Sequence, residues 1–216
     1  MSLIERMAIN IGTRSRTILD VDENREKVIV YGAISLLQLV WAIGWTSIVS
    51  LIFGVFYEAI IFLTIISILR KYSGGVHASS PNRCVFIGTF VATVTGLIVD
   101  RILYKINIYF VVVAGIVFIL IALIIIIRNA PVDSINKPIS KPELKQRFKF
   151  CSIIIILIYL LIMVASLILY TIHQNLIYIK FFQCIGLGTL WQSITLTENG
   201  AKGLNKFDAA LKYIFR

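Results

Sequence analysis

Long apolar runs separated by short polar connections dominate the sequence between residues 28 and 196. A helix that crosses the hydrocarbon core of a bilayer needs about 20 predominantly apolar residues, and six runs come close to that length. They cover residues 28-49, 51-69, 85-99, 106-127, 150-172 and 176-196. The pattern therefore predicts an all-α protein, a polytopic transmembrane helical bundle with four to six full spans.

The first two runs lie so close together that they could be taken for one helix. Residues 28-69 contain one charged side chain, Glu58, and as a single helix they would be about 60 Å long, twice the thickness of the bilayer core. We therefore expect a break near the region from Gly44 to Gly54. The run at 85-99 is short for a span, so we expect it to begin earlier, to tilt little or to be partly re-entrant.

Composition supports a membrane protein. Hydrophobic residues make up 58% of the 216 residues and charged residues 15%, and the mean hydropathy is +0.90. Soluble domains are far less apolar and carry about 25% charged residues. The apolar runs leave no room for a separate soluble domain, so we expect a single membrane domain over 1-216.

The formal net charge of +10 could indicate a nucleic-acid binder, but the basic residues are dispersed among short loops without interleaved aromatics. We expect no nucleic-acid partner. Eighteen of the 21 Lys and Arg residues fall on one set of alternate connections, and the other set receives Arg101, Lys105 and Lys180. The positive-inside rule then places both termini and the loops at 70-84 and 128-149 in the cytoplasm.

Both ends of the chain have an amphipathic pattern. In the segment 1-27, apolar residues from Leu3 to Ile11 share one helical face, and residues 204-215 repeat this pattern beside basic positions. We expect both segments to be interfacial helices that lie on the lipid surface. A dedicated substrate-docking surface is the alternative.

The connection at 70-84 gathers polar and turn-forming residues. Gly74 and Gly75 predict a sharp turn or a close approach of two backbones. Ser80 followed by Pro81 predicts a helix start, with Ser80 at the N-cap and proline at the first helical position. The residues that follow therefore occupy the first turns of a helix.

Cys84 lies in the first turn and a half of that predicted helix. The positive end of the helix dipole and the neighbouring Arg83 favour the thiolate over the thiol. On one continuous helix His77 and Cys84 would lie about 10 Å apart, so we expect a bend that lets the imidazole reach the sulfur and act as its general base.

The spacing alone leaves a plainer alternative open. A free cysteine is commonly an inert small hydrophobe. His77 and Cys84 are only two ligands and do not make a metal site, so we expect neither a metal nor a cofactor. Cys151 and Cys184 lie within apolar runs, where we expect them only to pack. His173 is predicted on the opposite side of the membrane from Cys84.

Two acidic residues lie in or at the edge of the runs. Ionisable groups are rare there and are either functional or paired. For Asp100, an ion pair with the adjacent Arg101 is an adequate explanation. For Glu58, the sequence identifies no partner.

The run from Arg70 to Cys84, with its Gly-Gly-x-His core and a cysteine seven residues after the histidine, strongly resembles the accessory gene regulator protein B family of bacterial membrane endopeptidases. The segment 130-139, which directly follows an apolar run, looks like that family's Ala-Pro…Lys-Pro-hydrophobic loop. Length, hydropathy and the order of these features agree as well. The resemblance covers nearly the whole chain.

The resemblance implies a cysteine endopeptidase of the bacterial cytoplasmic membrane. Its substrate would be a small amphipathic precursor peptide, cut on its C-terminal side as the first stage of making a cyclic quorum-sensing signal. Cys84 would be the nucleophile and His77 its base. The peptide would remain on Cys84 as a thioester until a cysteine or serine of the precursor attacks it and closes a thiolactone or lactone ring.

Further residues of this loop follow from the same resemblance and its surroundings. Arg70 and Gly75 match additional family positions, for which we expect substrate positioning or loop anchoring and loop shaping, respectively. Gly74, Ser80 and Asn82 are supporting candidates, and Asn82 is a candidate third catalytic residue by proximity. The family also suggests a homodimer.

Two other functional classes compete with the peptidase. A small peptide transporter or exporter should show repeat symmetry or paired Gly/Pro-interrupted spans, whereas the polar residues here gather in one connection. A non-enzymatic membrane scaffold would tolerate substitutions throughout 70-84.

Overall fold

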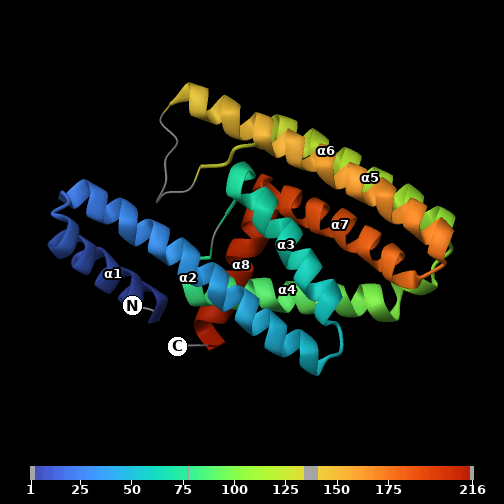
Figure 1. The fold of residues 1–216 in the computed structure, drawn as a ribbon, viewed down its shortest axis with the longest axis horizontal. Coiled ribbons are helices and arrows are strands. Elements are labelled where there is room, and N and C mark those ends of the chain that lie inside the picture. The colour runs from blue at the N-terminus through green and yellow to red at the C-terminus, as the bar shows by residue number, and fades with distance from the viewer. Residues whose placement is uncertain (1–2, 77, 134–140, 215–216) are drawn as a thin grey trace.

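A computed structural model describes residues 3–76, 78–133 and 141–214, and in this part of the chain eight α-helices and one 3-10 turn account for the regular structure (Figure 1). They are α1 (Leu3–Leu19), α2 (Glu23–Ile52), α3 (Phe56–Ser73), α4 (Pro81–Arg101), η1 (Leu103–Lys105), α5 (Ile108–Asn129), α6 (Pro142–His173), α7 (Leu176–Ile194) and α8 (Glu198–Ile214). The predicted all-α fold is confirmed.

The six apolar runs correspond to the six helices α2 to α7. Within the described residues, four helical stretches are long and apolar enough to cross a membrane, namely α2, α4 together with η1, α5 and α6. This agrees with the predicted four to six spans. Figure 1 shows successive helices from α2 to α7 running in alternate directions, so the end of α3 and the starts of α4 and α6 lie toward the same end of the bundle.

The break between the first two runs occurs where it was expected. The chain turns between α2 and α3 at residues 53–55, and Gly54 adopts a φ of 71°. The run at 85-99 belongs to a helix that begins earlier, at Pro81, and spans 21 residues. At 1.5 Å per residue this helix is about 31 Å long, enough for the bilayer core.

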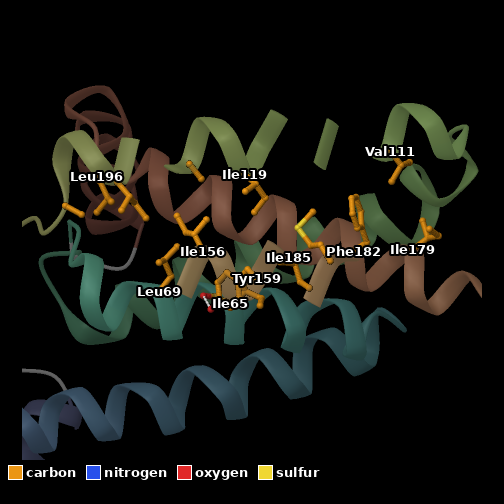
Figure 2. Close-up of a cluster of buried hydrophobic side chains, with 14 residues drawn as sticks. Ile65, Leu69, Val111, Ile119, Ile156, Tyr159, Ile179, Phe182, Ile185 and Leu196 are labelled. Atoms are coloured by element: carbon orange, nitrogen blue, oxygen red, sulfur yellow. Dashed lines mark hydrogen bonds between the residues drawn. The ribbon is translucent and has the colours of Figure 1, made fainter. Parts of the chain in front are cut away.

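Helix α7 lies at the centre of the bundle, between α3 on one side and α5 and α6 on the other (Figure 1). Figure 2 shows the buried side chains that join these four helices, including Leu69, Ile119, Ile156 and Ile185. Lipid tails are as apolar as these side chains. In a membrane the side chains therefore stabilise the bundle through close packing rather than through the hydrophobic effect.

Polar groups are also buried along α7. Gln183, Thr189, Gln192 and Ser193 are all buried there. In a membrane such side chains avoid lipid by facing neighbouring helices. Gln183 and Gln192 donate to groups outside α7, whereas the hydroxyls of Thr189 and Ser193 donate to carbonyls of α7 itself. A central position therefore explains why α7 can be less apolar than α5 or α6.

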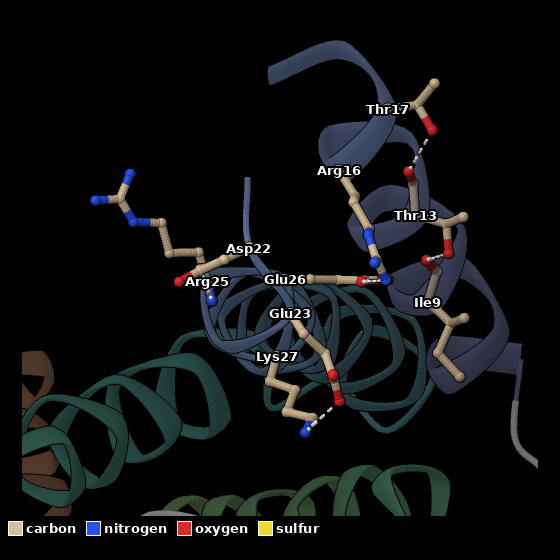
Figure 3. A network of polar contacts seen from close by, with 9 residues as sticks. All are labelled: Ile9, Thr13, Arg16, Thr17, Asp22, Glu23, Arg25, Glu26 and Lys27. Carbon is tan, nitrogen blue, oxygen red and sulfur yellow. Dashed lines mark hydrogen bonds and ion pairs between the residues drawn. The ribbon is translucent and has the colours of Figure 1, made fainter. Parts of the chain in front are cut away.

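Helix α1 packs along α2, and Ile4 and Ala8 of its apolar face are buried. Figure 3 shows the polar contacts that accompany this packing, with Arg16 Nη1 3.1 Å from Glu26 Oε2 and Asp22 capping α2 by accepting from the Arg25 backbone N–H. Part of the face predicted to lie on lipid is therefore covered by α2. The interfacial placement of α1 and α8 stays a prediction.

The two acidic residues singled out in the sequence belong to one charged cluster. Lys180 of α7 contacts Asp100 of α4 and lies 3.4 Å from Glu58 of α3, while Arg101 pairs with Asp100 at 3.1 Å. The expected Asp100–Arg101 pair is present, but it is incomplete as an explanation. Lys180 is the missing partner, and it connects three helices that are distant in sequence.

Candidate active site

The turn after α3 has the sharp geometry that the two glycines predict. Gly74 has a φ of 70° and Gly75 a φ of 131°, both in the region that L side chains rarely adopt. A Cβ atom on Gly74 would lie 2.1 Å from the carbonyl oxygen of Val132, and one on Gly75 would lie 3.3 Å from Thr195 Oγ1. At Gly74 both the backbone conformation and the lack of space therefore require glycine, whereas at Gly75 it is the backbone conformation that favours glycine.

The segment after α5 contacts this turn directly. The Val132 backbone N–H donates to the Ser73 carbonyl at 3.0 Å, and Gly74 and Val132 form an isolated parallel bridge. The two sequence motifs that carry the family resemblance, about 60 residues apart in the chain, are thus hydrogen-bonded to each other. Residues 134–140 of the second motif lie outside the described residues.

The end of α7 supports the same turn from the other side. The Gln192 amide donates to the Gly74 carbonyl at 2.8 Å and to Ser73 Oγ at 3.1 Å. Gln192 was not among the residues predicted from the sequence. The available signal was an amide within an apolar run, which in a membrane indicates a polar partner on a neighbouring helix.

Arg70, in the last turn of α3, is half-buried and its guanidinium donates to the Val76 carbonyl. This contact spans the glycine turn and ties the residues after it to α3. Loop anchoring, one of the two roles considered for Arg70, is therefore compatible with its position. Among the described residues, no contact of Arg70 tests its role in substrate binding, which stays a prediction.

Helix α4 begins as predicted, with Ser80 at the N-cap and Pro81 in the first turn. The Ser80 side chain makes no capping hydrogen bond, however, so the predicted side-chain cap is absent. The Cys84 backbone N–H donates to the Ser80 carbonyl at 3.0 Å, which places the cysteine at the end of the first helical turn. Cys84 is half-buried.

His77 lies outside the described residues. The approach of its imidazole to Cys84 therefore stays a prediction. Asn82 is exposed, and its side chain makes no hydrogen bond with any other residue in the described part of the chain. Its role as a third catalytic residue likewise stays a prediction.

Arg83, the neighbour of Cys84, binds a residue that the sequence did not single out. Its Nε lies 2.7 Å from Asp208 Oδ1 on α8, and Asp208 also accepts from the backbone N–H and the hydroxyl of Ser79. The Arg83 charge, which was expected to act on the Cys84 sulfur, is thus matched by a carboxylate. Asp208 gave no sequence signal beyond its place in an amphipathic segment.

Cys84 forms part of the wall of a cavity of about 610 Å³. The cavity extends between α2, α3 and α4, and its lining includes Leu39, Phe62, Val91 and Trp191. Arg70, Lys71, Gly74, Gly75 and Pro131 also contribute to the lining. A half-buried thiol therefore faces a mostly apolar space bounded by polar loop residues, a combination typical of binding pockets.

The other candidates lie apart from this cavity. Cys184 is fully buried in α7, and Cys151 is half-buried in α6. His173 ends α6, with its ring centroid 5.9 Å from that of Tyr178, at the opposite end of the bundle from the start of α4 (Figure 1). Among the described residues, no group of three or more His, Cys, Asp or Glu side chains is arranged to hold a metal ion.

A family model described as "Accessory gene regulator B" matches residues 4–196. This chain belongs to the accessory gene regulator B family. A protein of Clostridium perfringens (strain SM101 / Type A) named as AgrB-like is 37% identical over 209 residues, 96% of this chain and 97% of that protein. A second AgrB-like protein, from Clostridium perfringens (strain 13 / Type A), is 36% identical over 208 residues, with the same coverage of both chains. No solved structure matches the chain.

Family membership confirms the resemblance based on residues 70-84 and 130-139. With its apolar helices, this member of the accessory gene regulator B family is a multi-pass membrane protein with a role in the accessory gene regulator system. The family model ends at residue 196, so α8 and Asp208 lie beyond it.

Proposed function

We propose that this AgrB-family protein is a membrane-embedded cysteine endopeptidase. It cleaves the C-terminal part of a small amphipathic quorum-sensing precursor, with Cys84 as nucleophile and His77 as general base. The observation that carries the proposal is the position of Cys84, in the first turn of α4 at the wall of the cavity between α2, α3 and α4.

The reaction proceeds in two acyl transfers. His77 takes the thiol proton as Cys84 Sγ attacks the carbonyl carbon of the scissile bond, and the same proton passes to the leaving amine as the C–N bond breaks. The N-terminal fragment then remains on Cys84 as a thioester. A cysteine thiol or serine hydroxyl within that fragment then attacks the thioester carbonyl, the bond from that carbonyl carbon to Cys84 Sγ breaks, and the ring closes. The proton of the attacking group passes through His77 to Cys84 Sγ and regenerates the thiol.

The second transfer requires no ATP because one thioester replaces another when the attacking group is a thiol. Attack by water on the enzyme thioester would release a linear peptide and waste the acyl group. An apolar cavity that excludes water favours ring closure over hydrolysis. The lining by Leu39, Phe62, Val91 and Trp191 supports this role.

The proposal includes a cytoplasmic location for the site. The connection at 70-84 and the basic segment 128-149 carry nine of the basic residues on the side that the positive-inside rule assigns to the cytoplasm. Arg70 and Lys71 border the cavity there. Their charges would attract an acidic segment of the precursor to the cavity mouth.

Co-expression with the candidate precursor tests the enzyme proposal. A short reading frame beside the gene, with an amphipathic start, an internal Cys or Ser and an acidic tail, would identify that precursor. Cys84→Ala and His77→Ala should abolish the mass shift of cleavage, and Cys84→Ser should nearly abolish it. Cys151→Ala, which alters a half-buried thiol on α6, is the matched control and should process normally. Normal processing by Cys84→Ala would exclude Cys84 as the nucleophile and, with it, the proposed peptidase.

A further inference from the structure

Asp208 is a buried carboxylate on a helix that is otherwise largely exposed. Among residues 201–213 of α8, Asp208 and Leu211 are the two buried positions, and Asp208 is 7% exposed. A buried charge is costly unless it is paired and hydrogen-bonded. The structure provides partners for both carboxylate oxygens.

The partners of Asp208 all come from the segment that precedes Cys84. Oδ2 accepts from the Ser79 backbone N–H at 3.1 Å and from the Ser79 hydroxyl, and Oδ1 accepts from Arg83 Nε at 2.7 Å. Arg83 Nη2 in turn donates to Ser79 Oγ. These three residues form a closed set of contacts, the Asp208 clamp.

The Asp208 carboxyl of the clamp is ionised at neutral pH. Burial alone would raise the pKa of the Asp208 carboxyl, but the hydrogen bonds from Ser79 and the charge of Arg83 outweigh burial and hold that pKa below its ordinary value. The carboxylate therefore keeps its charge and its full acceptor capacity at neutral pH.

The clamp holds the start of α4 at a point where the helix lacks its usual cap. Ser80 occupies the N-cap position without a side-chain hydrogen bond. Ser79 and Arg83, which flank residues 80–82, are both bound to Asp208 of α8. Figure 1 shows α8 lying beside the start of α4. Cys84 directly follows Arg83, so the clamp fixes the backbone that carries the thiol.

We infer that Asp208 is a positioning residue of the cysteine-protease site, a carboxylate supplied by α8 that holds residues 79–83 and thereby aims Cys84. The inference rests on the proposed function. Asp208 acts through Ser79 and Arg83 and makes no contact with Cys84 among the described interactions. A shift of about 1 Å in a nucleophile can cost roughly 100-fold in rate, so loss of the clamp affects turnover more than binding.

The test compares full-length protein in lipid vesicles carrying Asp208→Asn, Asp208→Glu or Glu198→Gln with the wild type, with the precursor identified by co-expression as substrate. We expect Asp208→Asn to lower kcat about 10- to 100-fold with KM changed less than about twofold, and Asp208→Glu to recover part of the loss. Glu198→Gln, which removes an exposed carboxylate of the same helix, should match the wild type.

A readout independent of turnover is hydrogen exchange of the backbone amides of residues 78–86. Exchange should be faster in Asp208→Asn and unchanged in Glu198→Gln, because local opening follows loss of local contacts. Adding Arg83→Gln to Asp208→Asn should lower kcat little further, since the two residues act as one unit.

Two results would overturn the inference while leaving the peptidase intact. The first is a kcat of Asp208→Asn equal to that of the wild type, measured where Cys84→Ala is inactive. The other is a loss of turnover that only follows the fraction of unfolded protein, with unchanged exchange at 78–86 in the folded fraction. Normal processing by Cys84→Ala would instead overturn the proposed function, and the catalytic role of Asp208 with it.

Discussion

The two glycines after α3 show how a single residue type fixes the shape of the loop that leads to Cys84. The sequence predicted a turn at Gly74 and Gly75, and the structure adds the reason that each must be glycine. Gly74 meets the backbone of Val132, whereas Gly75 meets the side chains of Gln192 and Thr195. Backbone atoms cannot move aside as side chains can, so Gly74 is the less tolerant of the two positions.

Gly75→Ala should fold but lose activity. An L residue at a φ of 131° carries roughly 1–3 kcal/mol of strain, and if that strain displaces the loop, turnover falls about 5- to 150-fold. Turnover of precursor by purified protein measures this effect. Gly44→Ala is the matched control, because a Cβ atom there meets nothing within 4 Å. Equal activity of both variants would show that the conformation of Gly75 is irrelevant to the site.

The pH dependence of the Asp208 clamp has a defined sign. Because the pKa of Asp208 lies below its ordinary value of 3.8, the unfolded chain binds the proton more tightly than the folded one, and the stability that the clamp contributes is fully present above that ordinary value. It is lost as the pH falls further, through the folded pKa. Thermal unfolding of the wild type and Asp208→Asn from about pH 3 to about pH 8 should show a constant difference in midpoint above about pH 5 and a shrinking one below about pH 4. A difference that grows on acidification would contradict the assignment.

At the scale of the elements, the helices could be predicted because each has a local signal. The apolar run located α5 and the Ser80–Pro81 pair located the start of α4. The partners of the loop could not be predicted in the same way. Val132, Gln192 and Asp208 lie about 60 to 130 residues away along the chain, and their hydrogen bonds arise from the packing of α5, α7 and α8 around the turn.

The same limit applies to the charged cluster that joins α3, α4 and α7. The sequence marked Glu58 and Asp100 as unusual, because ionisable groups are costly in a span. It could not identify Lys180 as their common partner, since that assignment depends on how three helices pack. The cluster lies toward the end of the bundle opposite Cys84, and its contacts account for it as a structural feature.

Lys180→Met should therefore destabilise the bundle without changing the chemistry at Cys84. Removing Lys180 leaves Asp100 with Arg101 as its remaining partner but leaves the largely buried Glu58 carboxylate without a cation, which costs on the order of 3 kcal/mol. Thermal unfolding in detergent micelles measures the loss, and turnover per folded molecule should stay at the wild-type value. Lys202→Met removes an exposed pair and should change stability by less than about 1 kcal/mol. A Lys180→Met protein as stable as the wild type would show that the cluster is not a structural link.

For the whole molecule, the alternation of helix direction and the distribution of charge point to the same arrangement. The turns at 53–55, 102–107 and 174–175 lie toward one end of the bundle, and the loop before Cys84 lies toward the other (Figure 1). The described helices agree with the order of the predicted spans. Which end faces the cytoplasm follows from the positive-inside rule alone.

Thiol labelling in intact cells tests this sidedness. A membrane-impermeant maleimide added from outside should leave Cys84 unlabelled, and the same reagent should label it in inverted vesicles. A cysteine introduced at Lys105, the last residue of η1 at the opposite end of the bundle, is the control and should react from outside. Labelling of Cys84 in intact cells would reverse the assigned topology.

In the proposed reaction, Cys84 carries the peptide as a thioester. Intact-protein mass spectrometry after brief mixing with the precursor tests it most directly, in the wild type and in Cys84→Ala, with Cys151→Ala as the control. We expect an adduct with the mass of the N-terminal fragment on the wild type and on Cys151→Ala, located at Cys84 and released by hydroxylamine. Cleavage of the precursor with the same adduct on Cys84→Ala, or with no adduct at Cys84 in the wild type at any mixing time, would contradict it.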